Sequence, residues 1–350
     1  MSDKQELNYA AVLPEKGAHL KTLVRAIPVP GPDEILVRNH AIAANPVEWK
    51  MQTWSFFIQS YPTVLGSDVS GIITQIGSSV TKFKVGDRVT GFAGVIYNGN
   101  ADHGAWQTYT LLKEIVTCKI PDFVSFEEGS VIPMAFATSA IALFVDLGIP
   151  YPAKTTQQPK PSGLLVWGAA SAVGTAAVQL ASNFGYKVYA TASAKHHEYL
   201  KSLGAFKTFD YHDSDVVQQI VASAKSSSIQ IDLGFDTVGA GDAPKLAAEV
   251  LLAARSTDKA KLALVLPWPG KEPQPEGIEI FQTNATRTSN DKSELGSWLF
   301  NDYLKVALEN KTIVPSPKIE IVEGGLNAAQ KVLDLLKAGV SGKKLVVKVE

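Results

Sequence analysis

The turn Gly168–Gly174, GAASAVG, is the part of the chain whose residues could best bind a diphosphate. It follows the apolar run Leu164–Trp167, which is typical of a buried strand, and it precedes a segment, 173–184, whose apolar spacing fits one helix face. A small-residue turn between a strand and a helix presents backbone N–H groups to phosphate oxygens. Ser171 and Ala172 stand where a dinucleotide fingerprint usually has glycines, so an ordinary strand–turn–helix joint remains the alternative.

The end of the next expected strand, Lys187–Thr191, offers hydrogen-bond donors instead of an acid. Sheets that bind NAD usually place Asp or Glu here to hold the ribose 2′-hydroxyl. Ser193, Lys195 and His196 could instead donate to a 2′-phosphate, which favours NADPH over NADH. Ser193 could also cap the expected helix Lys195–Leu203 while both cations stay solvated, and the two roles are compatible.

Strands and helices alternate from residue 164 onward, which predicts a doubly wound parallel sheet covered on both faces. The expected strands are Leu164–Trp167, Lys187–Thr191, Thr208–Asp210, Ile229–Phe235 and Leu262–Leu266, and the expected helices are Ser171–Phe184, Lys195–Leu203, Asp213–Ala224 and Asp242–Ala254. The segment 267–277, with four prolines, is expected to be a loop.

The first 125 or so residues are expected to be β-rich, because glycine and proline punctuate short apolar segments such as Val69–Ile76 and Arg88–Phe92. A helix is expected at Phe126–Phe144. The tail from Ser293 ends in an expected strand, Lys344–Val349, that has no place in the doubly wound sheet. We therefore expect the tail to return to the β-rich domain.

Composition excludes several classes of protein. The chain has 350 residues, 45% hydrophobic and 19% charged, with a formal net charge of −1, as in soluble globular proteins. No basic stripe suggests nucleic acid or an anionic membrane as a partner. We expect no bilayer-spanning stretch, no signal peptide and a cytoplasmic location. Cys118 is the only cysteine, which excludes an intrachain disulfide and a four-cysteine zinc site.

Several short segments occur in one order along the chain, and together they carry a family resemblance. They are NPVEWK (Asn45–Lys50), LGSDVSG (Leu65–Gly71), VGDRV (Val85–Val89), a helix with Thr138, WGAASAVG (Trp167–Gly174), LKSLGA (Leu200–Ala205), FDTVG (Phe235–Gly239) and SGKKLVVKV (Ser341–Val349). This order resembles the medium-chain dehydrogenase/reductase superfamily, and within it the zinc-independent quinone oxidoreductases and the fungal trans-acting enoyl reductases.

The resemblance implies an α/β protein with a GroES-like β-rich catalytic domain and a Rossmann domain. The expected boundaries are residues 1–127 for the first part of the catalytic domain, 128–288 for the NADP-binding domain and 289–350 for the return to the catalytic domain.

The NPVEWK segment would lie beside the nicotinamide if the resemblance holds. Lys50 is the candidate catalytic residue, because a lysine could stabilise an enolate or donate a proton. Alternatively, it is a surface lysine whose stem extends from the Trp49 region to solvent, or it holds the cofactor phosphates. Asn45, with Pro46 and Val47, would contact the cofactor at the nicotinamide ribose, and its alternative role is a turn residue.

The resemblance also assigns cofactor contacts elsewhere. Thr138 would hydrogen-bond the carboxamide, Tyr211 would join the 2′-phosphate site, and Lys343 would reach the cofactor. The backbone N–H groups that would face the diphosphate belong to Ser171, Ala172, Val173 and Gly174. Thr138 could instead bond its own backbone, and Lys343 could be a plain exposed charge. Asp210 and Asp213 lie near the expected 2′-phosphate site and leave NADH open.

Zinc-dependent relatives bind their metal at positions that hold unsuitable residues here. By alignment these positions are Asn45, Ser67, Asp68 and Met134. Amide, hydroxyl and thioether groups are poor ligands for Zn²⁺, which favours thiolate, imidazole and carboxylate. We therefore expect no metal site and no catalytic zinc.

Without a metal Lewis acid, the expected acceptor is one that is already activated. The sequence thus predicts an NADPH-dependent reductase that transfers hydride to a small-molecule enone, enoyl thioester, quinone or reactive aldehyde. Two alternatives stay open: a trans-acting enoyl reductase that partners a polyketide synthase, and an NADPH-binding protein without turnover. A homodimer joined at the edges of the Rossmann sheets also stays open. Substrate-pocket residues are expected from loops that include Trp54–Tyr61.

Overall fold

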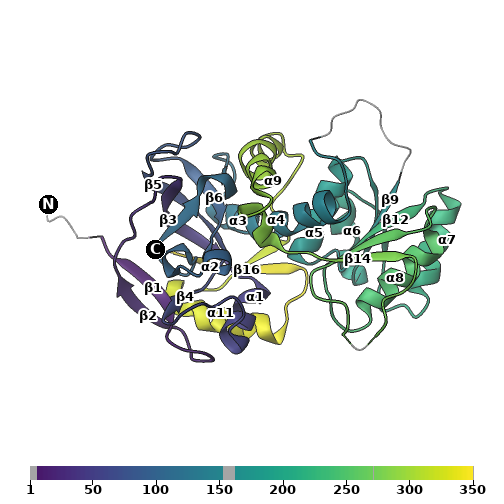
Figure 1. The fold of residues 1–350 in the computed structure, drawn as a ribbon, viewed down its shortest axis with the longest axis horizontal. Helices are drawn as coiled ribbons and strands as arrows, with labels where there is room; N and C mark the ends of the chain where they lie inside the picture. Colours follow the sequence, from purple (N-terminus) through teal and green to yellow (C-terminus); the bar gives the residue numbers. More distant parts are fainter. Residues whose placement is uncertain (1–5, 153–161, 271, 350) are drawn as a thin grey trace. The chain divides into compact units, whose positions relative to one another are not determined.

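The computed structural model of this chain describes residues 6–152, 162–270 and 272–349. The chain divides into two compact units. One comprises Met1–Met134, Thr286–Lys311 and Lys318–Glu350, and we call it the β-rich unit; the other comprises Ala135–Ala285 and Thr312–Pro317, and we call it the Rossmann unit. Figure 1 traces the chain from purple at the N-terminus to yellow at the C-terminus.

The β-rich unit contains two sheets. The larger has the strand order β15-β16-β3-β5-β6-β8, with β7 paired to β3, and the smaller has the order β2-β1-β4. The bounds are β1 (Asn8–Leu13), β2 (Lys21–Arg25), β3 (Glu34–Ala43), β4 (Thr63–Val64), β5 (Asp68–Ile76), β6 (Arg88–Phe92), β7 (Tyr109–Lys113), β8 (Thr117–Lys119), β15 (Lys318–Ile321) and β16 (Lys343–Lys348). The C-terminal strand is thus part of a sheet built mainly from the first third of the chain (Figure 1).

The helices of the β-rich unit come from both ends of the chain. From the N-terminal part they are α1 (Pro46–Trp54), α2 (Val95–Asn98) and α3 (Phe126–Ser130), and from the C-terminal part α9 (Ser293–Ser297), α10 (Leu304–Glu309) and α11 (Ala329–Ala338). Helix α1 begins directly after β3, because Asn45 is extended and Pro46 supplies a φ suited to a first helical position.

The Rossmann unit has one parallel sheet with the order β11-β10-β9-β12-β13-β14, which is the doubly wound arrangement. Its strands are β9 (Gly163–Trp167), β10 (Lys187–Thr191), β11 (Ala205–Phe209), β12 (Ile231–Asp236), β13 (Ala260–Leu264) and β14 (Ile278–Gln282), and its main helices are α5 (Ala172–Asn183), α6 (His197–Ser202), α7 (Val216–Ser226) and α8 (Ala243–Ala254). The expected fold class, α/β with a doubly wound parallel sheet, is confirmed.

The apolar core of the Rossmann unit explains this order. Leu165, Ile231 and Leu262 come from neighbouring strands, and they pack in one buried cluster with Ile220 of α7 and Leu251 of α8. The strands are short and rich in β-branched and leucine residues, as expected for a sheet buried on both faces.

The expectation that no segment of the chain is long and apolar enough to span a bilayer is wrong. From the sequence we expect no stretch that could span a bilayer, yet Phe126–Asp146 forms a helical stretch of 21 residues that is long and apolar enough to do so. It joins α3 to α4 (Pro133–Ala140) and a final π-helical turn. Of its most apolar window, 83% is buried inside the protein, which is how a core helix of this composition behaves.

Candidate functional site

The start of α1 lies against the start of β5 and the start of β16 in the β-rich unit. The β16 strand pairs antiparallel with the end of β3, and the Ala44 N–H donates to the Leu345 carbonyl at 3.0 Å. This register brings residue 344 beside the N-cap residue of α1, although the two lie about 300 positions apart in sequence.

A buried cluster of polar side chains results. The Lys344 ammonium lies 2.5 Å from Asp68 Oδ2 and donates to Asn45 Oδ1 at 3.0 Å. Asn45 Nδ2 donates to Asp68 Oδ2 at 2.9 Å, and the Met134 N–H donates to Asp68 Oδ1 at 2.7 Å. Burying a lysine and an aspartate is tolerated only when the charges are paired and hydrogen-bonded, as they are here.

Glu48, on the first turn of α1, extends this cluster. Its side chain is fully buried; Oε2 accepts a hydrogen bond from Trp106 Nε1 at 2.8 Å, and Oε1 accepts one from the Asn45 N–H at 3.2 Å. Burial, helped by the nearby Asp68 carboxylate, raises the pKa of Glu48 to about 8 in spite of the lowering effects of Trp106 and Lys344. Near neutral pH, Glu48 is therefore mostly protonated and the cluster has no net charge.

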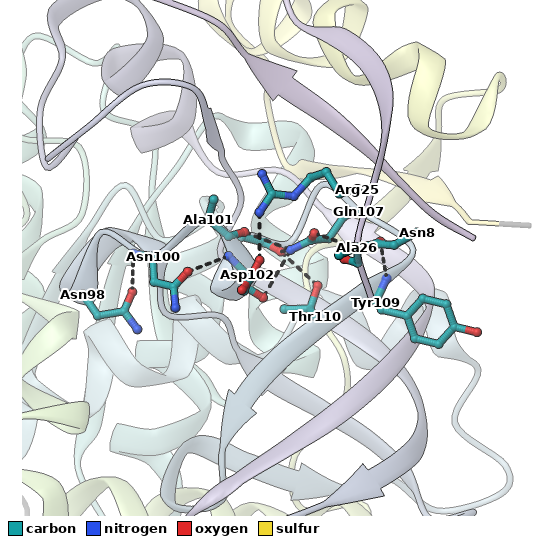
Figure 2. Close-up of polar contacts among 11 residues, drawn as sticks. Asn8, Arg25, Ala26, Asn98, Asn100, Ala101, Asp102, Gln107, Tyr109 and Thr110 are labelled. Atoms are coloured by element: carbon teal, nitrogen blue, oxygen red, sulfur yellow. Dashed lines mark hydrogen bonds and ion pairs between the residues drawn. The ribbon is translucent and has the colours of Figure 1, made fainter. Parts of the chain in front are cut away.

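A polar network fixes the loop that carries Trp106. Figure 2 shows Gln107, the next residue, at its centre. Gln107 Nε2 donates to the carbonyls of Ala101, Asp102 and Gly104, and Asp102 pairs with Arg25 at 2.8 Å. Gln107 is wholly buried, so the network keeps the Trp106 indole in reach of Glu48.

The residues at the zinc-ligand positions of related enzymes do not suit Zn²⁺. Both oxygens of Asp68 already accept hydrogen bonds from within the chain. Ser67 is wholly buried, and its hydroxyl has no hydrogen-bond partner in the structure. Among the described residues, no group of three or more His, Cys, Asp and Glu side chains could hold a metal ion. An amide, a hydroxyl and an occupied carboxylate are a poor donor set for this metal.

Lys50 lies outside the buried cluster. Its ammonium is 5.7 Å from the centroid of the Trp49 ring, and burial alone lowers the pKa of Lys50. In the part of the chain that the structure describes, no acceptor takes a hydrogen bond from this ammonium. At the start of the same helix, Pro46 is exposed and Val47 is half-buried, whereas Asn45 is only 5% exposed.

In the Rossmann unit, two N–H groups of the turn before α5 have no hydrogen-bond acceptor among the residues that the structure describes. Ser171 caps the helix: its Oγ accepts from the Gly174 N–H at 2.9 Å, while its own N–H donates to Gly168 O at 3.0 Å. Ala172 and Val173 are the first two helical residues, so their N–H groups have no intrahelical acceptor. Gly168 has a φ of 75°, which only glycine adopts without strain.

The end of β10 meets the end of β11 beside this turn. Ser193 Oγ donates to the Tyr211 hydroxyl at 3.3 Å. Asp210 accepts from the Ala194 N–H at 2.9 Å and from the His212 N–H at 3.0 Å, and His212 Nδ1 lies 2.6 Å from its Oδ1. The hydrogen bond from the His212 backbone, followed by those from the His212 ring and Ala194, lowers the pKa of Asp210 to about 2. The acid near the expected 2′-phosphate site therefore already has partners inside the unit.

The other cofactor contacts expected from the sequence in the Rossmann unit differ in their exposure to solvent. Lys195 is exposed and His196 half-buried on a short 3₁₀ turn, and the Ser193 side chain makes no capping bond there. Thr138 is 9% exposed on α4, one residue before Ser139, whose hydroxyl donates to the Val173 carbonyl at 3.0 Å.

Lys343 is half-exposed and pairs with Glu320, so the buried lysine of the C-terminal strand is its neighbour, Lys344. Sequence analysis overlooked Lys344 and Glu48. The available signals are a lysine directly before the apolar run Leu345–Val347 of the terminal strand and an acid within a helix that also carries two tryptophans.

The chain thus combines a β-rich unit that holds a buried ionic cluster with a unit built on a doubly wound parallel sheet. Two family models match the chain: the alcohol dehydrogenase GroES-like domain over residues 31–122 and the zinc-binding dehydrogenase domain over residues 172–263. The chain belongs to the medium-chain dehydrogenase/reductase superfamily, and its fold is the GroES-like and Rossmann pair that the sequence analysis expects. Membership in a dehydrogenase family implies a nicotinamide cofactor.

Two fungal relatives are named trans-enoyl reductases. The chain is 36% identical over 341 residues to the trans-enoyl reductase tndF of Aspergillus flavipes, covering 97% of this chain and 98% of that one. It is 40% identical over 259 residues to the trans-enoyl reductase tazE of Aspergillus terreus, covering 73% and 84%.

Solved structures support the fold. An alcohol dehydrogenase superfamily protein from Novosphingobium aromaticivorans superposes with a TM-score of 0.80 at 21% identity, covering 98% of this chain and 100% of that one. The CurK enoyl reductase superposes with a TM-score of 0.77 at 20% identity, covering 99% and 100%.

Proposed function

We propose that this protein is an NADPH-dependent, zinc-independent reductase that transfers hydride to an activated acceptor, with an enoyl group as the leading candidate. The observation that carries the proposal is the occupied Asp68 carboxylate. Its two oxygens serve Lys344, Asn45 and the Met134 N–H, which leaves no free donor set for a metal Lewis acid. An acceptor with its own electron-withdrawing group suits such a site, and both fungal relatives have enoyl reductase names.

In this proposal Lys50 acts on the acceptor. A bound reduced nicotinamide would supply hydride to the β-carbon of the enoyl group. Negative charge would then develop on the acceptor oxygen, and a proton would add at the α-carbon to give the saturated product. The Lys50 ammonium has no acceptor within the described residues, so it is free to donate to the developing oxyanion.

The cofactor contacts are proposed from the Rossmann unit first. The Ala172 and Val173 N–H groups face the diphosphate, with Ser171 and Gly174 shaping the turn. The proposed contacts of the 2′-phosphate are Ser193, Lys195, His196 and Tyr211. The nearby Asp210 carboxylate supports this set, because it already interacts with the Ala194 N–H and the His212 ring. Thr138 is proposed for the carboxamide.

The remaining sequence-based cofactor contacts are Asn45, Pro46, Val47 and Lys343. For two of them the structure sets a condition. Asn45 uses its oxygen and one amide hydrogen inside the chain, so only the second hydrogen is left for a ribose. Lys343 would have to leave Glu320 to reach a phosphate.

A partner polyketide synthase is the second proposal, favoured by the trans-enoyl reductase names of the relatives. A cytoplasmic homodimer is proposed as well, since β14 is the edge strand of the parallel sheet and could pair with a second copy. An NADPH-binding protein without turnover is the remaining alternative.

The direct test follows NADPH absorbance in the presence of enoyl thioesters, enals and quinones. Oxidation with at least one enoyl acceptor supports the proposal. Tight NADPH binding without oxidation by any acceptor would contradict the reductase function and leave the alternative of an NADPH-binding protein without turnover. Elemental analysis of the purified protein should find less than stoichiometric zinc, and one zinc per chain would overturn the metal-independent mechanism.

A further inference from the structure

An exposed row of aromatic rings extends from the second turn of α1 into the loop that follows. Trp49 and Trp54 have ring centroids 5.2 Å apart, Trp54 and Phe56 5.5 Å, and Phe56 and Phe57 6.5 Å. We call Trp49, Trp54, Phe56 and Phe57 the aromatic row. The last three are 48%, 51% and 52% exposed. Large rings that touch one another and still face water form the kind of patch that marks a binding surface.

The backbone holds these rings outward. Helix α1 ends at Trp54, and Ser55 adopts a left-handed conformation with φ 61°, which is common at a helix end. Phe57 also has a positive φ, 60°, which is strained for a bulky residue. The loop closes through Ser55 Oγ, which is hydrogen-bonded to the Tyr61 hydroxyl at 2.8 Å. A strained residue that presents an exposed ring is typical of a ligand contact.

The two ends of the aromatic row differ in charge. Lys50 lies at one end, with its ammonium 5.7 Å from the Trp49 ring. The segment that follows, residues 51–62, contains no charged residue. A single cation beside a stretch of apolar, π-rich surface complements a ligand with a hydrogen-bond-accepting carbonyl at one end and a long unsaturated tail.

We propose that the aromatic row binds the hydrocarbon chain of the acceptor, so that the substrate class is a long, unsaturated acyl chain whose reacting enoyl end lies at Lys50. This inference rests on the proposed function. It goes beyond it by naming the part of the substrate that does not react and the residues that select it. The row then binds long-chain acceptors more tightly than short-chain ones, while Lys50 interacts with the reacting enoyl end of both in the same way.

The first test is a chain-length series of 2-enoyl thioesters with 4, 8 and 12 carbons, assayed with NADPH. Trp54→Ala should lower kcat/KM for the longest acceptor about ten-fold or more, mainly through KM, and change the shortest less than about two-fold. Trp54→Phe should keep most of the preference for long chains. Phe123→Ala removes a 58% exposed ring outside the row and should leave the series unchanged. An equal loss for all chain lengths in Trp54→Ala would overturn the inference.

The second test does not depend on turnover. A conjugated tetraenoic fatty acid absorbs where tryptophan emits, so its binding should quench the fluorescence of the wild type with a Kd that Phe57→Ala raises about ten-fold. Quenching that depends on Phe57, in a protein that reduces no acceptor, would support acyl-chain binding by the aromatic row and contradict the proposed reductase function. Turnover of enoyl thioesters without chain-length preference and without quenching would support the reductase function and contradict acyl-chain binding by the row. A preference seen only with carrier-protein-bound acyl chains would assign the row to a protein partner and refute it as a chain-binding surface.

Discussion

Lys344 and Asp68 form an ion pair at 2.5 Å with side chains that are 3% and 0% exposed. The pair joins the last strand of the chain to the start of β5, and Asn45 bridges both partners. It therefore fastens the C-terminal segment to the helix that carries Lys50. The position of the proposed catalytic group depends on a contact that forms only when the ends of the β-rich unit come together.

Removal of the Lys344 ammonium should destabilise the protein strongly. In Lys344→Met the Asp68 carboxylate loses its cation in a buried setting, which costs about 3–5 kcal/mol. Urea unfolding at pH 7 measures the difference. Lys343→Met is the matched control, because Lys343 is half-exposed and pairs with exposed Glu320, so its loss should cost about 1 kcal/mol or less. Similar losses in the two variants would contradict a special role for the buried pair.

Glu48 should make stability depend on pH. Its pKa is raised from 4.5 to about 8 in the folded protein, so the protonated form is favoured by folding. This contribution is fully present below about pH 4.5 and is lost as the pH rises toward 8, at up to about 1.4 kcal/mol per pH unit. Glu48→Gln cannot ionise and keeps an acceptor for Trp106. The wild-type minus variant difference in unfolding free energy, measured from pH 5 to 9, should therefore fall with pH. A flat difference would mean that Glu48 titrates normally.

Lys195 should distinguish the two cofactors. Its replacement by alanine removes a cation that would meet only the 2′-phosphate, so the Kd for NADPH should rise about 10- to 100-fold while that for NADH changes little. Cofactor fluorescence titration measures both. Lys201→Ala offers a control on the following helix, where the exposed lysine pairs with Glu198. Equal weakening of both cofactors by Lys195→Ala would refute the 2′-phosphate role.

Much of the Rossmann unit follows from local sequence. Strand β10 occupies the expected range Lys187–Thr191, and the small-residue turn before α5 lies where the apolar periodicity places it. Here each strand is a short apolar run and each helix has its own periodicity, so neighbours in sequence determine the elements. Strand β14 at Ile278–Gln282 was not expected. It follows a proline-rich loop and is completed by pairing with β13, which local patterns do not reveal.

The buried cluster could not be predicted from the sequence for the same reason. Asn45 was singled out by its motif, but its partner Lys344 lies at the other end of the chain, and the choice between Lys343 and Lys344 depends on the β16 register. A shift of one residue exchanges the two faces of a strand. The sequence singles out Lys343 only as a possible cofactor contact, whereas the lysine in the buried cluster is its neighbour, Lys344.

Lys50 should control the rate of reduction more than the binding of cofactor. Lys50→Met removes the donor that would stabilise the developing oxyanion, so kcat for an enoyl acceptor should fall about 100-fold or more, while the Kd for NADPH changes less than about three-fold. The pH profile adds a readout that a structural role would not produce. Burial lowers the pKa of Lys50, so wild-type kcat should decline at a pH below the ordinary lysine value of about 10.4, as the ammonium loses its proton. Lys50→Arg keeps a cation that does not titrate in this range, and its residual activity should show no such alkaline decline. A variant that loses NADPH binding and rate together, with an unchanged pH profile, would instead assign Lys50 to the cofactor phosphates.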